Sequence, residues 1–124
     1  MKIAQYDPVR QFSVGHDGEI VLSHCGDVEL APDEQITFTS ESGSEYDVVR
    51  KVWGYYATPS LNRRLPDHGL RPALVRSGEL IYLLLVENGA EPAFHSYLES
   101  QNMEVMLWLD GAIDMLPGHK GTET

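Results

Sequence analysis

The part of the sequence richest in anion-binding groups runs from Val49 to Leu65. Arginine guanidinium groups bind phosphate or carboxylate through paired hydrogen bonds, and aromatic faces stack on sugars or bases. Serine hydroxyl and asparagine amide groups can hold the hydroxyl groups of a ligand in one orientation. We therefore predict that an anionic small molecule binds at seven residues: Arg50, Trp53, Tyr55, Ser60, Asn62, Arg63 and Arg64.

The same region is unusual in its charge. The 124-residue chain carries a formal net charge of −10. Between Arg50 and Arg76 it has six of its nine basic residues and one acid, Asp67, so this segment is +5 and the remainder is −15. In the alternative interpretation, the aromatic rings form a core face and the basic side chains pair with the chain's many carboxylates. The overall negative charge argues against nucleic acid and membrane as partners, because both are anionic.

Metal ligands are not predicted. Successive side chains of a strand point to opposite faces, so the neighbours His24 and Cys25 would diverge, and His16 falls in a turn. We expect His16 to be exposed and Cys25 to be a buried thiol that packs like a small apolar side chain.

Catalytic residues are also not identified. The phosphate-binding loop, the dinucleotide fingerprint and the nucleophile elbow are absent. Tyr55, Tyr56 and His68 could transfer protons, although a turn is the more common role of a histidine in Asp67-His68-Gly69. We expect no cofactor, and a binding role rather than catalysis.

The chain has the features of a cytoplasmic protein. The residues after Lys2 lack the apolar stretch of a signal peptide, and the longest apolar run, Leu80–Val86, is too short to cross a bilayer. The single cysteine, Cys25, cannot form an internal disulfide and fits a reducing compartment.

The first half of the chain predicts short antiparallel strands of a sandwich or barrel-like sheet. The run 35–39 alternates clearly, with Ile36 and Phe38 facing inward. We expect Asp7-Pro8 and Gly26-Asp27 to interrupt strands, and 46–56 to be extended throughout.

The second half predicts a β-β-α-β order. One helical turn is expected over 60–65, capped by Ser60 and ended by Pro66. A hairpin then turns at Ser77-Gly78, and its strand 80–86 is apolar enough to be covered on both faces. A helix over 92–101, with Phe94, Tyr97 and Leu98 on one stripe, precedes a strand over 103–109. We predict a single α+β domain over residues 1–116 and a flexible tail over 117–124.

One combination of segments carries a family resemblance: residues 45–48, 53–62, Arg64-Leu65, Gly69-Leu70, 82–87, Phe94 and Tyr97-Leu98. Together they resemble small bacterial proteins encoded among surface-carbohydrate genes. The similarity covers roughly residues 38–110, and it implies a bacterial cytoplasmic protein with a link to sugar metabolism. It brings no established activity or catalytic residues.

Three functional hypotheses follow. The first is a non-catalytic binding or accessory protein for an anionic small molecule, such as a phosphorylated or nucleotide-linked sugar. The second is a protein-interaction subunit or a homodimer that uses the Arg50–Arg76 segment as its interface. The third is a small β-barrel enzyme that uses His24, or Tyr55, Tyr56 and His68.

Overall fold

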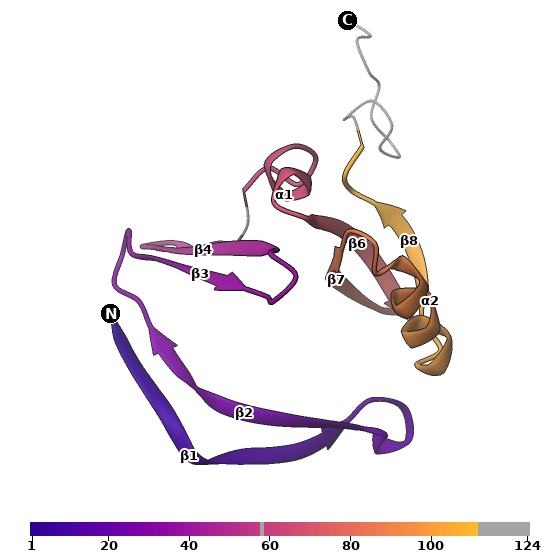
Figure 1. Cartoon of the computed structure of the whole chain (residues 1–124), viewed down its shortest axis with the longest axis horizontal. Coiled ribbons are helices and arrows are strands. Elements are labelled where there is room, and N and C mark those ends of the chain that lie inside the picture. Colours follow the sequence, from indigo (N-terminus) through magenta and orange to yellow (C-terminus); the bar gives the residue numbers. More distant parts are fainter. Residues whose placement is uncertain (58, 112–124) are drawn as a thin grey trace, which may run out of the picture. The chain divides into compact units, whose positions relative to one another are not determined.

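A computed structural model describes residues 1–57 and 59–111. These residues form an α+β fold of mostly antiparallel strands in three small sheets, with two short α-helices (Figure 1). The predicted fold class is therefore confirmed. The chain divides into two compact units, of which the first comprises residues 1–36 and 48–57 and the second comprises 37–47 and 58–124.

The first unit contains a long hairpin. Strand β1 (Lys2–Val14) pairs antiparallel with β2 (Ile20–Glu29), and the short 3-10 helix η1 (His16–Gly18) lies between them in the chain. The predicted breaks at Asp7-Pro8 and Gly26-Asp27 were wrong. A register shift between Gln5 and Arg10 accommodates the proline without ending β1. At Gly26 a Cβ atom would lie 2.2 Å from the Ala4 carbonyl oxygen, so the close strand approach requires glycine.

A three-stranded sheet has the order β3-β4-β5, formed by β3 (Gln35–Thr39), β4 (Glu45–Lys51) and β5 (Gly54–Tyr56). Continuous extended structure over 46–56 was predicted, and that prediction was wrong. Val52 and Trp53 form a turn, and Gly54 follows with φ of +148°, which a residue with a side chain rarely adopts. The turn places Arg50 opposite Tyr55 in the β4–β5 hairpin.

The second unit contains the predicted β-β-α-β arrangement. Strands β6 (Leu70–Ser77), β7 (Leu80–Glu87) and β8 (Glu104–Trp108) form an antiparallel sheet in the order β7-β6-β8. Helix α2 (Glu91–Ser100) supplies Phe94 and Leu98 to the core of this unit. The other members of this core are Ala73, Val75, Leu84, Met103, Val105 and Trp108.

Helix α1 (Arg64–Asp67) differs from the turn predicted over 60–65. It begins at Arg64 and contains Pro66, which fits there because the first helical turn needs no N–H donor from the proline. Ser60 still stabilises its start, since the Oγ atom accepts a hydrogen bond of 2.9 Å from the Arg64 backbone N–H. Leu65 is completely buried, and α1 packs against β6.

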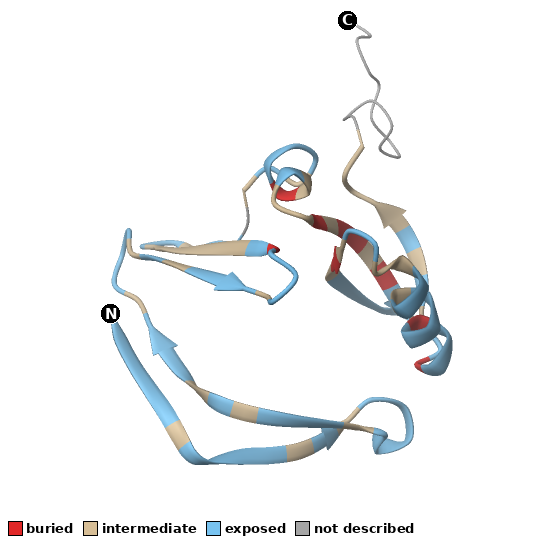
Figure 2. Cartoon of the chain, viewed as in Figure 1, coloured by how far each residue is buried: buried red, intermediate tan, exposed pale blue. Residues whose placement is uncertain are grey.

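Burial is concentrated in the second unit. The buried hydrophobic residues of the described ranges lie on α1, β6, β7 and α2, whereas β1 and β2 have none (Figure 2). The prediction that 80–86 is covered on both faces was wrong for its first four residues, which are exposed. Among the described strands β7 is at the edge of its sheet, with β6 paired to one side of it. Phe38 was predicted to face inward, and Tyr97 was predicted on the apolar stripe of the helix, but both are exposed. Met106, in the predicted strand 103–109, is exposed as well.

In the described part of the chain, the helices are too short and too polar to span a bilayer. The predicted tail over 117–124 and the end of the predicted domain at 116 lie outside the described residues.

Candidate functional site

The β4–β5 hairpin presents three of the seven predicted residues in the first unit. The guanidinium carbon of Arg50 lies 5.5 Å from the centre of the Tyr55 ring, and Nη1 of Arg50 donates a 3.0 Å hydrogen bond to the Gly54 carbonyl. The contact with Tyr55 follows from the strand register, because Arg50 and Tyr55 are directly opposite each other and share a face. Trp53 is 69% exposed and Tyr55 is 61% exposed, so both rings are available for stacking.

The other four predicted residues belong to the second unit, in the segment that leads into α1. Asn62, Arg63 and Arg64 are exposed. The backbone N–H of Arg64 is bonded to the Ser60 hydroxyl, and that of Leu65 to the Ser60 carbonyl at 3.0 Å. These two donors are therefore occupied, and an anion at this segment would be bound by side chains.

The basic residues between 50 and 76 fall into two classes. Lys51 pairs with Asp33 at 2.6 Å, Arg71 pairs with Asp110 and Glu91, and Arg76 pairs with Glu104. Within residues 1–57 and 59–111, the remaining three, Arg50, Arg63 and Arg64, form no ion pair with a carboxylate. The expectation that carboxylates neutralise the basic segment therefore holds for half of its cations.

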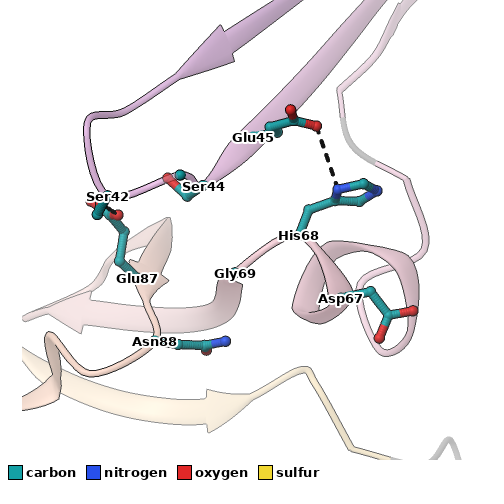
Figure 3. Close-up of a pocket in the computed structure, with 9 residues that line it drawn as sticks. Ser42, Ser44, Glu45, Asp67, His68, Gly69, Glu87 and Asn88 are labelled. Atoms are coloured by element: carbon teal, nitrogen blue, oxygen red, sulfur yellow. Dashed lines mark hydrogen bonds and ion pairs between the residues drawn. The ribbon is translucent and has the colours of Figure 1, made fainter.

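A polar cleft in the second unit was not predicted from the sequence. It has a volume of about 450 Å³ (Figure 3). Its Glu45 carboxylate lies 3.5 Å from Nδ1 of His68, and Glu87 accepts hydrogen bonds from Ser40 and Ser42. Because three carboxylates and no Lys or Arg line it, this cleft is unsuited to an anion. The lining residues are Ser42, Gly43, Ser44, Glu45, Asp67, His68, Gly69, Glu87 and Asn88.

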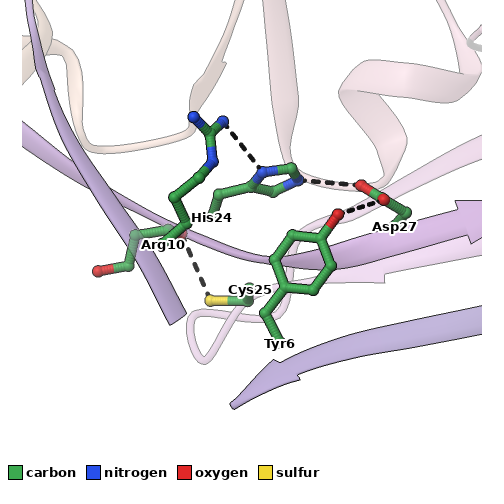
Figure 4. Close-up of polar contacts among 6 residues, drawn as sticks. Tyr6, Arg10, His24, Cys25 and Asp27 are labelled. Atoms are coloured by element: carbon green, nitrogen blue, oxygen red, sulfur yellow. Dashed lines mark hydrogen bonds and ion pairs between the residues drawn. The ribbon is translucent and has the colours of Figure 1, made fainter. Parts of the chain in front are cut away.

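A second unpredicted cluster joins β1 to β2 (Figure 4). His24 contacts Asp27 through Nε2 at 3.1 Å and Arg10 through Nδ1 at 3.3 Å. A guanidinium can only donate, so Nδ1 accepts and Nε2 carries the proton that is donated to Asp27. Tyr6 also donates to Asp27, and this hydrogen bond, followed by desolvation and the charge of Asp27, raises the pKa of Tyr6. With both ring nitrogens of His24 engaged, the cluster holds the hairpin together across its register shift.

The remaining candidate residues are distributed over the two units. Tyr55 and Tyr56 are in β5 of the first unit, and His68 follows α1 in the second. Cys25 was predicted to be buried but is exposed, because the two-stranded hairpin has no buried face within its own unit. Across the described ranges, no three His, Cys, Asp or Glu side chains are grouped as metal ligands.

Acid is expected to weaken the second unit through Glu91. Hydrogen bonds from its own backbone N–H, from Arg71 and from Gly89, together with the charge of Arg71, lower the pKa of Glu91 below its usual value. A lowered pKa in the folded state stabilises the fold above the unfolded pKa, and this stabilisation is lost as the pH falls through the folded pKa. The difference in melting temperature between the native protein and E91Q should therefore shrink from pH 7 to about pH 3.

The variant E99Q is the matched control, since Glu99 is an exposed residue of the same helix that makes no ion pair within the described ranges. It should leave the pH dependence of melting nearly unchanged. If the difference in melting temperature between the native protein and E91Q were the same at pH 7 and pH 3, the ionised Glu91 carboxylate would not stabilise the second unit as described.

The described residues thus define a small α+β protein with mainly antiparallel sheets and basic, aromatic groups on its surface. Comparisons with protein-family models, with curated proteins and with solved structures gave no match. The similarity to proteins of surface-carbohydrate gene neighbourhoods stays a prediction, and the function is inferred from the side chains themselves.

Proposed function

We propose that this is a non-catalytic binding or accessory protein whose β4–β5 hairpin binds an anionic small molecule, a phosphorylated or nucleotide-linked sugar. One observation carries the proposal: Arg50 has no carboxylate partner among the described residues, although it lies beside the exposed ring of Tyr55 in a strongly acidic chain. An arginine in such a chain would readily find a carboxylate unless its position favoured another anion.

The geometry of Arg50 suits this role. A guanidinium has five N–H donors, and within the described residues the side chain of Arg50 uses one of them, in the hydrogen bond to Gly54. The contact with the Tyr55 ring holds the guanidinium in place, so less side-chain freedom is lost when an anion binds. The exposed ring of Trp53 would stack on a base or sugar attached to the anion.

The segment from Ser60 to Arg64 is the second part of the proposed binding function. Arg63 and Arg64 also lack carboxylate partners in the described part of the chain, and Asn62 offers an amide to ligand hydroxyl groups. Within the second unit this segment is basic, whereas the cleft around Glu45 and Glu87 is acidic. An anion should therefore prefer the basic segment to the cleft.

The test is a thermal-shift screen with UDP-glucose, UDP, glucose 6-phosphate and inorganic phosphate. A compound present at 100 times its dissociation constant should stabilise the protein by about 2.7 kcal/mol. The variants R50Q and W53A should then weaken binding about tenfold or more, because a charge-assisted hydrogen bond or a stacked ring is lost.

Lys51→Ala is the matched control, because it removes one positive charge from the neighbouring position, where Asp33 already neutralises it. Its affinity should stay within about threefold of the native value. An unchanged melting temperature with all four compounds would overturn the proposal. Equal losses of binding affinity for R50Q and K51A would overturn it as well.

A protein-interaction role for the same hairpin is the second candidate. Val52 is exposed at the turn beside Trp53, and an anionic small molecule gains little from an exposed valine. Exposed aromatic and apolar residues next to arginine are typical of interface centres. A V52K variant distinguishes the two candidates, since it should weaken a protein contact but leave binding of UDP-glucose nearly unchanged.

A further inference from the structure

The first half of strand β7 is an exposed apolar edge. Leu80 and Ile81 are each 62% exposed, Tyr82 is 40% exposed and Leu83 is 47% exposed. Alternate strand residues point to opposite faces, so four consecutive exposed residues mean that, within the described part of the second unit, neither face is covered here. Strand β7 also pairs with β6 on one side only among the described strands, which leaves backbone N–H and C=O groups free along the other side.

Edges of this kind are usually protected by charged residues, proline or a bulge. Residues 80–86 have none of these in the sequence, and the β6–β7 register is continuous from Leu70–Glu87 to Ser77–Leu80. Runs of exposed apolar residues on an unpaired edge promote strand addition. This edge is thus equipped to pair with another strand.

We propose that β7 pairs antiparallel with β7 of a second copy of this chain, forming a homodimer with a continuous six-stranded sheet. A two-fold axis perpendicular to the sheet at Tyr82 would place Ile81 opposite Leu83 and Leu80 opposite Leu84. Every central pair would then be apolar. The nearest acids would not face each other, because Glu79 lies in the hairpin turn on the side of Leu85 and Glu87 would extend beyond the turn of the second copy.

The available area sets the strength of this dimer. The four exposed side chains and Tyr97, which lines an apolar groove with Leu85 and Val86, offer roughly 500 Å² per copy. Two copies would bury at most about 1,000 Å², which is the lower limit for a specific interface. The dimer should therefore be weak, with a dissociation constant in the micromolar range.

Sedimentation velocity of the full chain over about 1 to 300 μM should reveal a monomer–dimer equilibrium. The variant Ile81→Lys introduces a charge at an exposed position of the edge and should raise the dimer dissociation constant about tenfold or more. Its melting temperature at low concentration should match that of the native protein. The matched control V52K makes a similar apolar-to-lysine change at an exposed turn outside the edge, and should leave dimerisation unchanged.

A cysteine cross-link tests the register. In a C25S background, Y82C should form a disulfide-linked dimer under mild oxidation, because residue 82 of one chain would lie opposite residue 82 of the other. V52C should stay mainly monomeric. A native protein that remains monomeric at the highest concentration overturns the proposal, and so does dimerisation that V52K weakens and I81K does not.

Discussion

Replacing Leu65 with alanine is expected to lower the free energy of unfolding by about 3 kcal/mol, the loss typical of a fully buried leucine. Leu65 is completely buried, and it is the buried residue of the four-residue helix α1. A helix this short has little stability of its own, so its position depends on packing against β6. Removing the side chain leaves a cavity and also removes the main apolar contact of the helix.

The measurement for L65A is urea denaturation followed by fluorescence. Trp108 is a half-buried residue of the second unit, so its emission reports on the unfolding of that unit. Leu80→Ala is the control at about 1 μM protein, because it makes the same chemical change at an exposed position and should lower stability by less than about 1 kcal/mol. If L65A and L80A lowered the free energy of unfolding equally, α1 would not pack against β6 as described.

The sequence predicts the second unit well for a physical reason. The turn Ser77-Gly78 separates two apolar strands, and Gly78 has φ of +60°, which glycine adopts without strain. Pro92 occupies the first turn of α2, where it costs no hydrogen bond. In each case a local signal agrees with the packing, so the predicted hairpin, helix and final strand are confirmed.

The errors arise where local signals and pairing disagree. Asp7-Pro8 normally ends a strand, but among the described strands β1 pairs on one side only and bulges there, so the missing N–H donor is tolerated. Val52 and Trp53 are typical strand residues, and only Gly54 indicated that the chain turns there. The exposure of Leu80–Leu83 depends on which strand lies at the sheet edge, and hydrophobicity alone does not contain that information.

The candidate site is predictable only in part for a similar reason. The sequence shows that residues 50–76 are basic, but ion pairs depend on side chains distant in the chain. Arg71 pairs with Asp110, 39 residues away, and Arg76 pairs with Glu104, 28 residues away. The cleft at His68 was missed likewise, because Ser42 and Glu87 are 45 residues apart.

Replacing Arg71 with alanine is expected to lower the free energy of unfolding by about 2 kcal/mol, the second largest of these effects. Nε of Arg71 donates to Asp110 at 2.7 Å, Nη1 donates to Glu91 at 3.2 Å, and the guanidinium carbon lies 4.1 Å from the centre of the Trp108 ring. These hydrogen bonds raise the pKa of Arg71, and the bond to Asp110 has the largest effect. One side chain thus connects β6, the start of α2 and the chain just after β8.

All three charged groups are at most about one-third exposed, so water screens their interactions less than it screens a surface pair. The variant R71K keeps the charge but loses the forked geometry and the stacking, and should lose about half as much stability as R71A.

Arg76→Ala is the control, since Arg76 and Glu104 are more than half exposed and their pair should contribute less than about 1 kcal/mol. Urea denaturation of the four proteins measures the series. If R76A lost as much stability as R71A, general charge balance rather than the contacts of Arg71 would stabilise this unit, because both variants remove one positive charge from strand β6.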